Sequence, residues 1–227
     1  MKTFFKNIYL FSELNDSEFD AITALATTQR FAKHNVIVQE GEQGESLYII
    51  LEGSVKISTY SCDGREVILS LLEQGAIFGE MSLLDKRPRS ANVTSLEATR
   101  VVQIRRKHFE QLLLKMPSLT IKLLTEVVSR LRRTSIILER ISTMDVPHRL
   151  YSYLQDFCER FGELKDKQMR VQLPTHQLIA DQLSTSRETI SRAISSLKKE
   201  KIICPIPNSR SVCIDMDALE TLLFSMQ

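Results

Sequence analysis

SLYIILEGSVKIST, residues 46–59, indicates that the amino-terminal half is built of β-strands. It is one of several short runs rich in β-branched and other apolar residues, and turn residues separate these runs at the spacing of a sandwich or barrel. The other runs are NVIVQEG (35–41), REVILSLL (65–72), SANVTSL (90–96) and TRVVQI (99–104). Six of the seven glycines lie between Gly41 and Gly79, and no helical pattern interrupts the runs. We therefore predict an antiparallel β-roll over about residues 30–104, preceded by a helix over residues 16–26 that is capped at residues 15–17.

Beyond residue 105 the apolar period changes from 2 to 3.6 residues, which indicates helices. Residues 107–116, KHFEQLLLKM, predict a short amphipathic helix that stops before Pro117. Residues 117–145 then continue without glycine or internal proline, which predicts one long helix. Its apolar residues follow the alternating spacing of a coiled coil, with Thr134 as a polar member: Leu124, Val127, Leu131, Leu138 and Ile141.

A helix of this length would extend for about 40 Å, and its apolar stripe needs a partner. We expect two copies of the chain to pair along it as a homodimer. Packing of the helix against its own β-domain is the alternative. A polar residue such as Thr134 within the stripe serves either a ligand or the register of the pair.

The carboxy-terminal part predicts a helix–turn–helix followed by a hairpin. Asp145 and Pro147 mark a hinge between helices, and residues 147–162 predict a helix with Gly162 as its C-cap. Residues 173–203 divide into two short helices; Thr175 is expected to cap the first, and Thr185 with Glu188 fits a capping box for the second. Residues 202–214, IICPIPNSRSVCI, predict a β-hairpin that would form a wing.

The second of these helices has the composition of a DNA-reading helix. Its apolar residues fix an inner face, which leaves a polar set facing outward: Arg187, Glu188, Ser191, Arg192 and Ser195. In a major groove, arginine bonds guanine O6 and N7, and a carboxylate accepts from cytosine N4. The pattern favours double-stranded DNA as a partner. The alternative is a solvated helix whose charges bind nothing, with Glu188 serving only the cap.

Composition excludes several other classes of protein. The 227 residues are 43% apolar, which suffices for packed cores, and the net charge of +2 conceals a basic excess between Arg187 and Arg210. No apolar run approaches a membrane span or a signal-peptide core, so we expect a cytoplasmic protein that does not enter the membrane, with reduced thiols. The four cysteines form no CxxC pair, and the four histidines have no evident nucleophile or ligand partner. We therefore expect neither a bound metal nor a catalytic activity.

Residues 78–93, FGEMSLLDKRPRSANV, combine a carboxylate and an arginine in a way that suits a sugar phosphate. A phosphate needs backbone N–H donors and a positive fork, which Arg89 supplies. A ribose hydroxyl needs an acceptor, which Glu80 can be. Apolar neighbours would exclude water and strengthen both contacts. The alternative is an exposed turn with a surface Glu–Arg pair, which is worth at most about 1 kcal/mol.

Two of these motifs resemble those of the Crp/Fnr family of transcription regulators, close to its cyclic-AMP receptor branch. Residues 78–93 are similar to the phosphate-binding cassette of cyclic-nucleotide domains, and STSRETISRAISSLKKEKII, residues 184–203, resembles the family's recognition helix with its R-E-x-x-x-R motif. The resemblance covers nearly the whole chain. It implies an α+β protein with a jelly-roll-type cyclic-nucleotide-binding β-roll and flanking helices (1–116), a long coiled-coil dimerisation helix (117–144) and a winged helix–turn–helix (145–227).

The resemblance also implies the roles of particular residues. In the cassette, Gly79 offers its backbone, Glu80 takes the ribose 2′-hydroxyl, and Arg89 with Ser90 grips the cyclic phosphate. The implied nucleotide site consists of Gly79, Glu80, Met81, Ser82, Arg89 and Ser90, with Thr134 and Ser135 of the long helix meeting the adenine, the serine from the other subunit. The implied DNA-binding set is Thr185, Ser186, Arg187, Glu188, Ser191, Arg192, Lys198 and Lys199.

The sequence therefore predicts a homodimeric regulator that binds double-stranded DNA, answers to cyclic AMP and works with RNA polymerase. Within the family resemblance, Arg187, Glu188 and Arg192 would read a TGTGA-like palindrome, whereas Ser191 resembles the Fnr branch instead. A regulator that answers to cyclic GMP, to a cyclic dinucleotide or to no ligand is the nearer alternative. A cyclic-nucleotide module without DNA binding is the more distant one, and it would have no use for Arg187, Arg192 and the hairpin.

Overall fold

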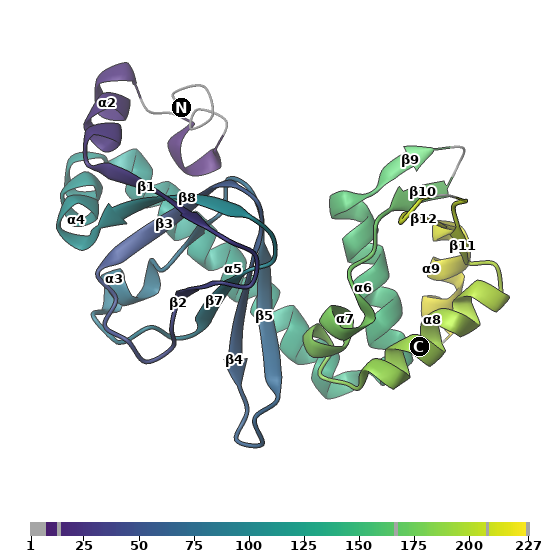
Figure 1. Cartoon of the computed structure of the whole chain (residues 1–227). Helices are drawn as coiled ribbons and strands as arrows, with labels where there is room; N and C mark the ends of the chain where they lie inside the picture. The colour runs from purple at the N-terminus through teal and green to yellow at the C-terminus, as the bar shows by residue number, and fades with distance from the viewer. Residues whose placement is uncertain (1–7, 13–14, 166–167, 208, 226–227) are drawn as a thin grey trace. The chain divides into compact units, whose positions relative to one another are not determined.

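The computed structural model describes residues 8–12, 15–165, 168–207 and 209–225 (Figure 1). The chain folds as two compact units that divide between Arg132 and Arg133. Two antiparallel sheets dominate the first unit, and helices with one small sheet form the second. The α+β class predicted from the sequence is confirmed.

The amino-terminal unit is built on two four-stranded antiparallel sheets, with strand orders β1-β8-β3-β6 and β2-β7-β4-β5. Neighbours that are distant in sequence, such as β1 beside β8, are typical of a roll rather than a meander. The strands are β1 (Ala26–Phe31), β2 (Val36–Val38), β3 (Ser46–Glu52), β4 (Val55–Tyr60), β5 (Glu66–Leu72), β6 (Ile77–Phe78), β7 (Asn92–Ser95) and β8 (Thr99–Arg105).

Strand β3 is buried on both faces because its alternate residues enter two different cores. Leu47 and Ile49 face a core that the flanking helices close. Tyr48 and Ile50 face the space between the two sheets, where they join Val55 and other residues of the second sheet. Strand β3 therefore packs against both the second sheet and the flanking helices.

The first unit also contains η1 (Tyr9–Phe11), α2 (Asp16–Ala24), α3 (Met81–Asp85) and α4 (Arg106–Lys115). The predicted cap of α2 is confirmed: Asn15 Oδ1 accepts from the Glu18 amide at 2.9 Å, and Glu18 Oε2 accepts from the Asn15 amide at 3.0 Å. The expectation that no helix interrupts residues 30–104 is wrong, because α3 lies between β6 and β7. Its five residues are too few to show a helical period.

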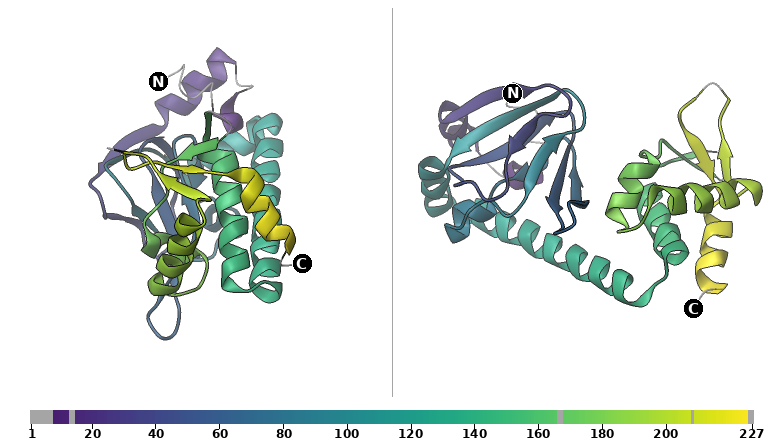
Figure 2. Two further views of the ribbon diagram at one scale, coloured as in Figure 1. Left: turned by 90° about the vertical axis from the view of Figure 1, so that its right-hand side faces the viewer. Right: turned by 60° about the horizontal axis from the view of Figure 1, so that its bottom comes forward.

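Helix α5 (Pro117–Thr143) is one continuous helix of 27 residues (Figure 2). Its early residues Leu119 and Leu123 are buried in the core of the first unit, so the alternative of packing on its own β-domain holds for the first turns. Further apolar residues are exposed and form what we call the α5 stripe: Ile121, Leu124, Val128, Leu131 and Leu138. Val127, which the sequence placed in the stripe, is half-buried, and Val128 is exposed in its place.

The carboxy-terminal unit packs helices α6 to α9 and a small antiparallel sheet around a core that includes Leu150, Ile179, Ile190 and Ile214. Its elements are α6 (Val146–Phe161), β9 (Glu163–Lys165), β10 (Gln168–Val171), α7 (His176–Gln182), α8 (Arg187–Lys199), β11 (Ile203–Pro205), β12 (Val212–Ile214) and α9 (Met216–Ser225). The predicted hairpin is confirmed as β11 and β12, which we call the wing; Asn208 of the quoted segment lies outside the described residues. Strands β9 and β10 and helix α9 were not predicted.

Two predicted caps of this unit are confirmed, at Thr175 and Gly162, and one is wrong; Asp145, which the sequence placed only at a hinge, also caps a helix. Asp145 accepts from the His148 amide at 2.9 Å, and Thr175 accepts from the Leu178 amide at 3.2 Å. Gly162 ends α6 as predicted, in an extended conformation that leaves no room for a Cβ beside Met169.

The expected capping box of Thr185 and Glu188 is wrong, because Ser186 caps α8 and accepts from the Thr189 amide at 3.1 Å. The Thr185 amide instead donates to Ala180 O of α7 at 3.0 Å. The turn therefore uses one residue more than the T-x-x-E pattern assumes.

None of the described helices is long and apolar enough to cross a membrane.

Candidate nucleotide-binding and DNA-binding sites

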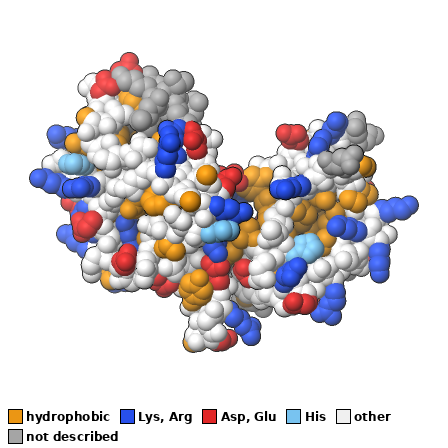
Figure 3. Space-filling model, viewed as in Figure 1, with side chains coloured by type: hydrophobic (Ala, Val, Ile, Leu, Met, Phe, Trp, Pro, Cys, Tyr) orange, Lys and Arg blue, Asp and Glu red, His pale blue; other side chains and the backbone are white. Residues whose placement is uncertain are grey.

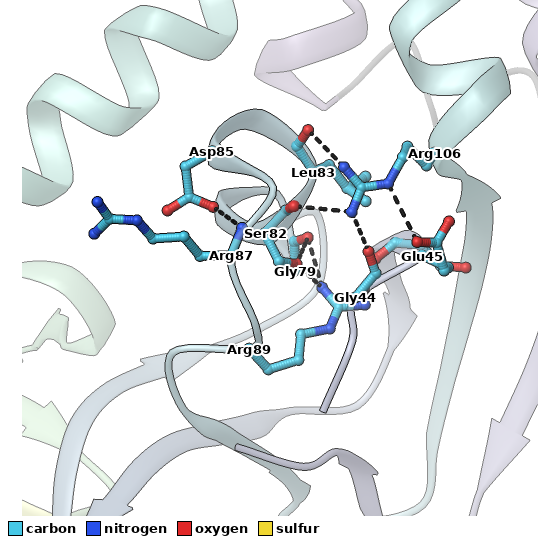
Figure 4. Close-up of polar contacts among 10 residues, drawn as sticks. Gly44, Glu45, Gly79, Ser82, Leu83, Asp85, Arg87, Arg89 and Arg106 are labelled. Atoms are coloured by element: carbon cyan, nitrogen blue, oxygen red, sulfur yellow. Dashed lines mark hydrogen bonds and ion pairs between the residues drawn. The ribbon is translucent and has the colours of Figure 1, made fainter. Parts of the chain in front are cut away.

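Residues 78–93, which we call the cassette, run from β6 through α3 to β7 and enclose the Arg89 side chain (Figure 4). Gly79 has φ +80°, and a Cβ there would lie 2.6 Å from Arg89 Nη1. Gly44, in the loop before β3, is equally close: a Cβ would lie 2.8 Å from Arg89 Cζ. The two glycines therefore make the space that the guanidinium occupies.

Arg89 is 8% exposed and bonds neutral oxygens. Its Nη1 donates to Gly79 O at 2.7 Å and to Ser82 Oγ at 2.8 Å, and its Nη2 donates to Ser46 O at 2.7 Å. A guanidinium has five N–H donors, so two remain without an acceptor among the described residues. No carboxylate of those residues forms an ion pair with it. Arg89 is thus a buried cation held in position but not neutralised.

The electrostatic surroundings of Arg89 agree with its burial. Burial lowers the pKa of Arg89 below its ordinary value, and Tyr48 and Glu80 act in the opposite direction. The Tyr48 ring centre lies 6.0 Å from Arg89 Cζ, at the limit of a cation–π contact. An arginine keeps its charge under these conditions, so an anion entering the cassette would find a positive group from which water has been excluded.

Glu80 is the second buried charge of the cassette and is 3% exposed. Its Oε1 pairs with Arg130 Nη1 of α5 at 2.9 Å, whereas its Oε2 is buried and has no hydrogen-bond partner among the described residues. Burial raises the pKa of Glu80, and Arg130 opposes the rise. The carboxylate is therefore fixed through one oxygen and keeps the other as an unused acceptor.

Arg130 and Arg106 are two positioning residues that sequence reasoning missed. Arg130 also donates to Ile77 O at 2.7 Å, which ties α5 to the strand that leads into the cassette. Arg106 Nη2 donates to Gly44 O at 2.6 Å and Ser82 O at 3.0 Å, and thereby joins the loop before β3 to α3. The sequence offers one weak signal, since Arg130 stands one helical turn before Thr134.

The remaining predicted nucleotide residues differ in exposure. Ser82 is buried against Arg89, whereas Met81 and Ser90 are exposed, with Ser90 Oγ 3.6 Å from Met81 Sδ. Arg87 is exposed and points away from the residues that hold Arg89 (Figure 4). Thr134 and Ser135 lie on the exposed surface of α5 beyond the division between the two units.

Helix α8 presents most of its predicted DNA-binding residues to solvent. Ile190, Ile194 and Leu197 are buried beneath it, and the exposed residues of the set are Ser186, Arg187, Glu188, Arg192, Lys198 and Lys199. Thr185 and Ser191 are half-buried. Basic side chains outnumber acidic ones on the visible face of this unit in Figure 3. The positive charges of α8 also act on α7: burial lowers the pKa of His176, and the charges of Lys198 and Arg187 lower it further.

Comparison with known proteins identifies the two domains in which the cassette and α8 lie. The profile of the cyclic nucleotide-binding domain matches residues 28–116, and that of the Crp-like helix-turn-helix domain matches residues 148–222. A CRP-like cAMP-activated global transcriptional regulator of Mycobacterium tuberculosis is 33% identical over 190 residues, which cover 82% of this chain and 84% of that protein. The cyclic AMP receptor protein of Thermus thermophilus is 30% identical over 195 residues, covering 86% and 87%.

Solved structures share the fold at lower identity. The structure of the c-di-GMP responsive global regulator CLP of Xanthomonas campestris superimposes with a TM-score of 0.75 at 19% identity, covering 88% of this chain and 99% of that one. Taken together, the two domain matches and the curated relatives define a regulator that joins a cyclic-nucleotide domain to a DNA-binding domain. The chain belongs to the Crp/Fnr family of transcription regulators, close to its cyclic-AMP receptor branch, and this is a family of regulators rather than enzymes.

Proposed function

We propose that this chain is a homodimeric transcription regulator in which cyclic AMP, bound in the cassette, controls binding to a palindromic DNA site. In functional terms we divide it into a nucleotide-binding part (1–116), a dimerisation helix (117–144) and a DNA-binding part (145–227). It would act in the cytoplasm, where it meets DNA and RNA polymerase.

The single observation that carries the nucleotide proposal is the unneutralised, buried guanidinium of Arg89. Buried charges in proteins are normally paired, because removing an ion from water is costly. The carbonyls of Gly79 and Ser46 hold the guanidinium but do not cancel its charge. A cyclic phosphate carries one negative charge and would accept from the two N–H groups that remain.

The state of Glu80 supports a ribose beside that phosphate. Its Oε2 is buried without a hydrogen-bond partner among the described residues, and such an atom gains about 1–3 kcal/mol when a partner is supplied. A ribose 2′-hydroxyl is a donor of the right kind. The two unsatisfied groups of the cassette therefore match the two polar ends of a cyclic nucleotide, an anion and a hydroxyl.

The α5 stripe supports the homodimer. An exposed row of large apolar side chains along a helix is typical of a surface that pairs with another helix. Thr134 and Ser135 lie within this part of α5, and we assign them to the adenine base, with the serine contributed by the partner subunit. The names of the relatives in Mycobacterium tuberculosis and Thermus thermophilus favour cyclic AMP.

For DNA, the exposed face of α8 supports the assignment of Arg187, Glu188 and Arg192 to the bases of a TGTGA-like half-site. Lys198 and Lys199, in the last turn, suit phosphate contacts. Two such helices in a symmetric dimer would enter successive major grooves about 34 Å apart.

Calorimetric titration tests the nucleotide assignment. The full chain should bind cyclic AMP more tightly than cyclic GMP, and Arg89→Gln should abolish binding, because an amide can still donate to the carbonyls but brings no charge. Arg87→Gln is the matched control, since Arg87 lies two residues earlier and is exposed. Wild-type affinity in Arg89→Gln would show that the cassette is not the nucleotide site.

The same titration decides between the proposal and its nearer alternative. The regulator from Xanthomonas campestris is named as responsive to c-di-GMP, so related folds answer to different nucleotides. Cyclic di-GMP therefore belongs in the titration as a third ligand. Preferential binding of cyclic di-GMP would leave the proposal of a ligand-controlled regulator in place, with cyclic di-GMP instead of cyclic AMP as its effector.

A further inference from the structure

The four cysteines occupy different surroundings. Cys158 of α6 is buried, and burial raises the pKa of its thiol to about 11, which leaves it unreactive. Cys62 is exposed in the turn between β4 and β5. Cys204 and Cys213 are both partly exposed, and they lie on the two strands of the wing.

The register of the wing places Cys204 directly opposite Cys213. Bonds at both ends of the ladder fix the pattern: the Asp215 amide donates to Ile202 O at 3.0 Å, and the Ile206 amide donates to Ser211 O at 3.3 Å. Hydrogen-bonded pairs alternate along antiparallel strands, so Cys204 and Cys213 form a hydrogen-bonded pair. Pro205 has no N–H, and it lies opposite Val212 in the next pair, which makes no hydrogen bonds. Its position agrees with this pattern.

This pairing brings the two thiols within reach of each other. Opposite residues of a bonded pair have Cα atoms about 5.5 Å apart, inside the 4.4–6.8 Å range of disulfides. Their side chains share one face of the sheet. The neighbouring pair, Ile203 and Ile214, is buried in the core, so the alternation of a strand turns Cys204 and Cys213 to the opposite, accessible face.

We propose that Cys204 and Cys213 are a redox modification site that forms a reversible disulfide on exposure to a peroxide. Each thiol gives up one proton and one electron. One S–S bond forms, the O–O bond of the peroxide breaks, and hydrogen peroxide leaves as two molecules of water. A dithiol reductant reverses the step by taking over the disulfide.

The geometry makes this a readily reducible bond. Cβ atoms of directly opposite residues lie about 4.5–5.5 Å apart, towards the upper end in a bonded pair, whereas a disulfide prefers about 3.8 Å. Closing the bond must draw the two strands together, and strained disulfides are easier to reduce. Forming the disulfide would also remove the hydrogen bond that Cys204 Sγ donates to Lys201 O at 3.4 Å. We therefore expect the structural change at the junction between α8 and the wing.

Peptide mapping tests the proposal on the full, reduced chain. Trypsin cuts after Lys201 and Arg210, so Cys204 lies in the peptide 202–210 and Cys213 in the peptide 211–227. After treatment with hydrogen peroxide and alkylation of the remaining thiols, we expect these two peptides to be linked, two hydrogens lighter than their sum. Dithiothreitol should separate them, and the oxidised protein should run at the mass of one chain on a non-reducing gel.

Variants assign the bond. Cys62→Ser should leave the linked peptides unchanged, whereas Cys204→Ser and Cys213→Ser should each abolish them. Peroxide treatment that leaves both wild-type thiols alkylated, oxidises each to a sulfenic or sulfinic acid without a link, or joins two chains would overturn the proposal. The wild-type map needs no variant to fold. It also needs neither nucleotide nor DNA, so it fails or succeeds independently of the proposed function.

Discussion

Among single residues, the cassette depends on buried charges that are supported from outside it. Arg130 reaches Glu80 across 50 positions of sequence, and the Glu80 carboxylate would otherwise have no cation bonded to it. Burial alone favours the protonated form of Glu80, while Arg130 and Arg89 favour the ionised form. The charge that we propose to meet a ribose is therefore maintained by a side chain of α5.

Arg130→Met should destabilise the first unit by on the order of 3 kcal/mol at neutral pH, because it leaves a buried carboxylate without its partner. The effect should depend on pH. A carboxyl whose folded-state pKa is raised above the unfolded value of 4.5 stabilises the fold while it is protonated, and this contribution is lost as pH rises through the folded-state pKa. Without Arg130 that pKa rises further, so the deficit should be larger at pH 8 than at pH 5.

Urea unfolding at the two pH values, followed by circular dichroism, measures this difference. Arg132→Met is the control, because Arg132 is exposed on the same helix. An equal loss of stability at both pH values would show that the ionisation of Glu80 is not involved.

Among the elements, α8 and α5 each carry one decisive feature of the proposal. Helix α8 begins at Arg187 because Ser186 supplies the cap, and this places Arg187 in the first turn. Helix α5 is buried on one side near its start and exposes the α5 stripe elsewhere. The first feature orients the proposed recognition helix, and the second supplies the proposed dimer contact.

Ser186→Ala should loosen the start of α8 by about 1 kcal/mol, the usual cost of an N-cap, which corresponds to a roughly fivefold larger population of the open state and equally faster amide exchange. Hydrogen exchange of the amides in the first turns of α8 measures the effect directly. Thr185→Ala is the matched variant, and it should change exchange little because its side chain does not cap the helix. If Thr185→Ala has the larger effect, the capping box predicted from the sequence operates in solution.

Leu131→Glu should convert the proposed dimer to monomers. Because each subunit loses one Leu131 side chain from the interface, the dimer loses about 1.5–3 kcal/mol of burial energy twice. The dimer dissociation constant should therefore rise at least about a hundredfold. Sedimentation equilibrium measures it. Arg132→Glu introduces the same side chain at the next position, outside the stripe, and should remain dimeric. A dimer that survives Leu131→Glu would have to associate through another surface.

In the whole molecule, the proposed function requires a nucleotide site in one unit to influence a DNA-binding surface in the other. Helix α5 belongs to both units, since it begins at Pro117 and ends at Thr143, on either side of the division. Its Arg130 contacts the cassette, and its exposed stripe is the proposed dimer contact. A ligand that binds two arrangements of this helix with different affinity would shift the population between them.

Arg187→Ala should cost about 1–3 kcal/mol on a TGTGA-type palindrome and relax the preference at one guanine. Lys198→Ala should instead weaken binding to all sequences alike and reduce the salt dependence by about one unit. Fluorescence anisotropy with matched and scrambled duplexes at several salt concentrations, with cyclic AMP saturating, separates the two. An equal loss on both duplexes for Arg187→Ala would make it a phosphate contact.

Features that depend on local spacing could be predicted from the amino-acid sequence. The β-rich runs, the long helix, the caps at Asn15 and Thr175, and the outward polar face of α8 all follow from periodicity or from contacts within four residues. The short helix α3 and the cap at Ser186 were missed, because five residues show no period and because the turn uses one residue more than the pattern assumes.

Features that depend on partners from different elements became visible only in the folded chain. Arg130 meets Glu80, Arg106 joins the Gly44 loop to α3, and the register of β11 and β12 sets Cys204 opposite Cys213. None of these pairs has a spacing that the sequence could reveal, because packing of whole elements and strand register bring the side chains together. The same packing buries Arg89 with no counter-ion among the described residues, and this unneutralised charge is what we propose a ligand would meet.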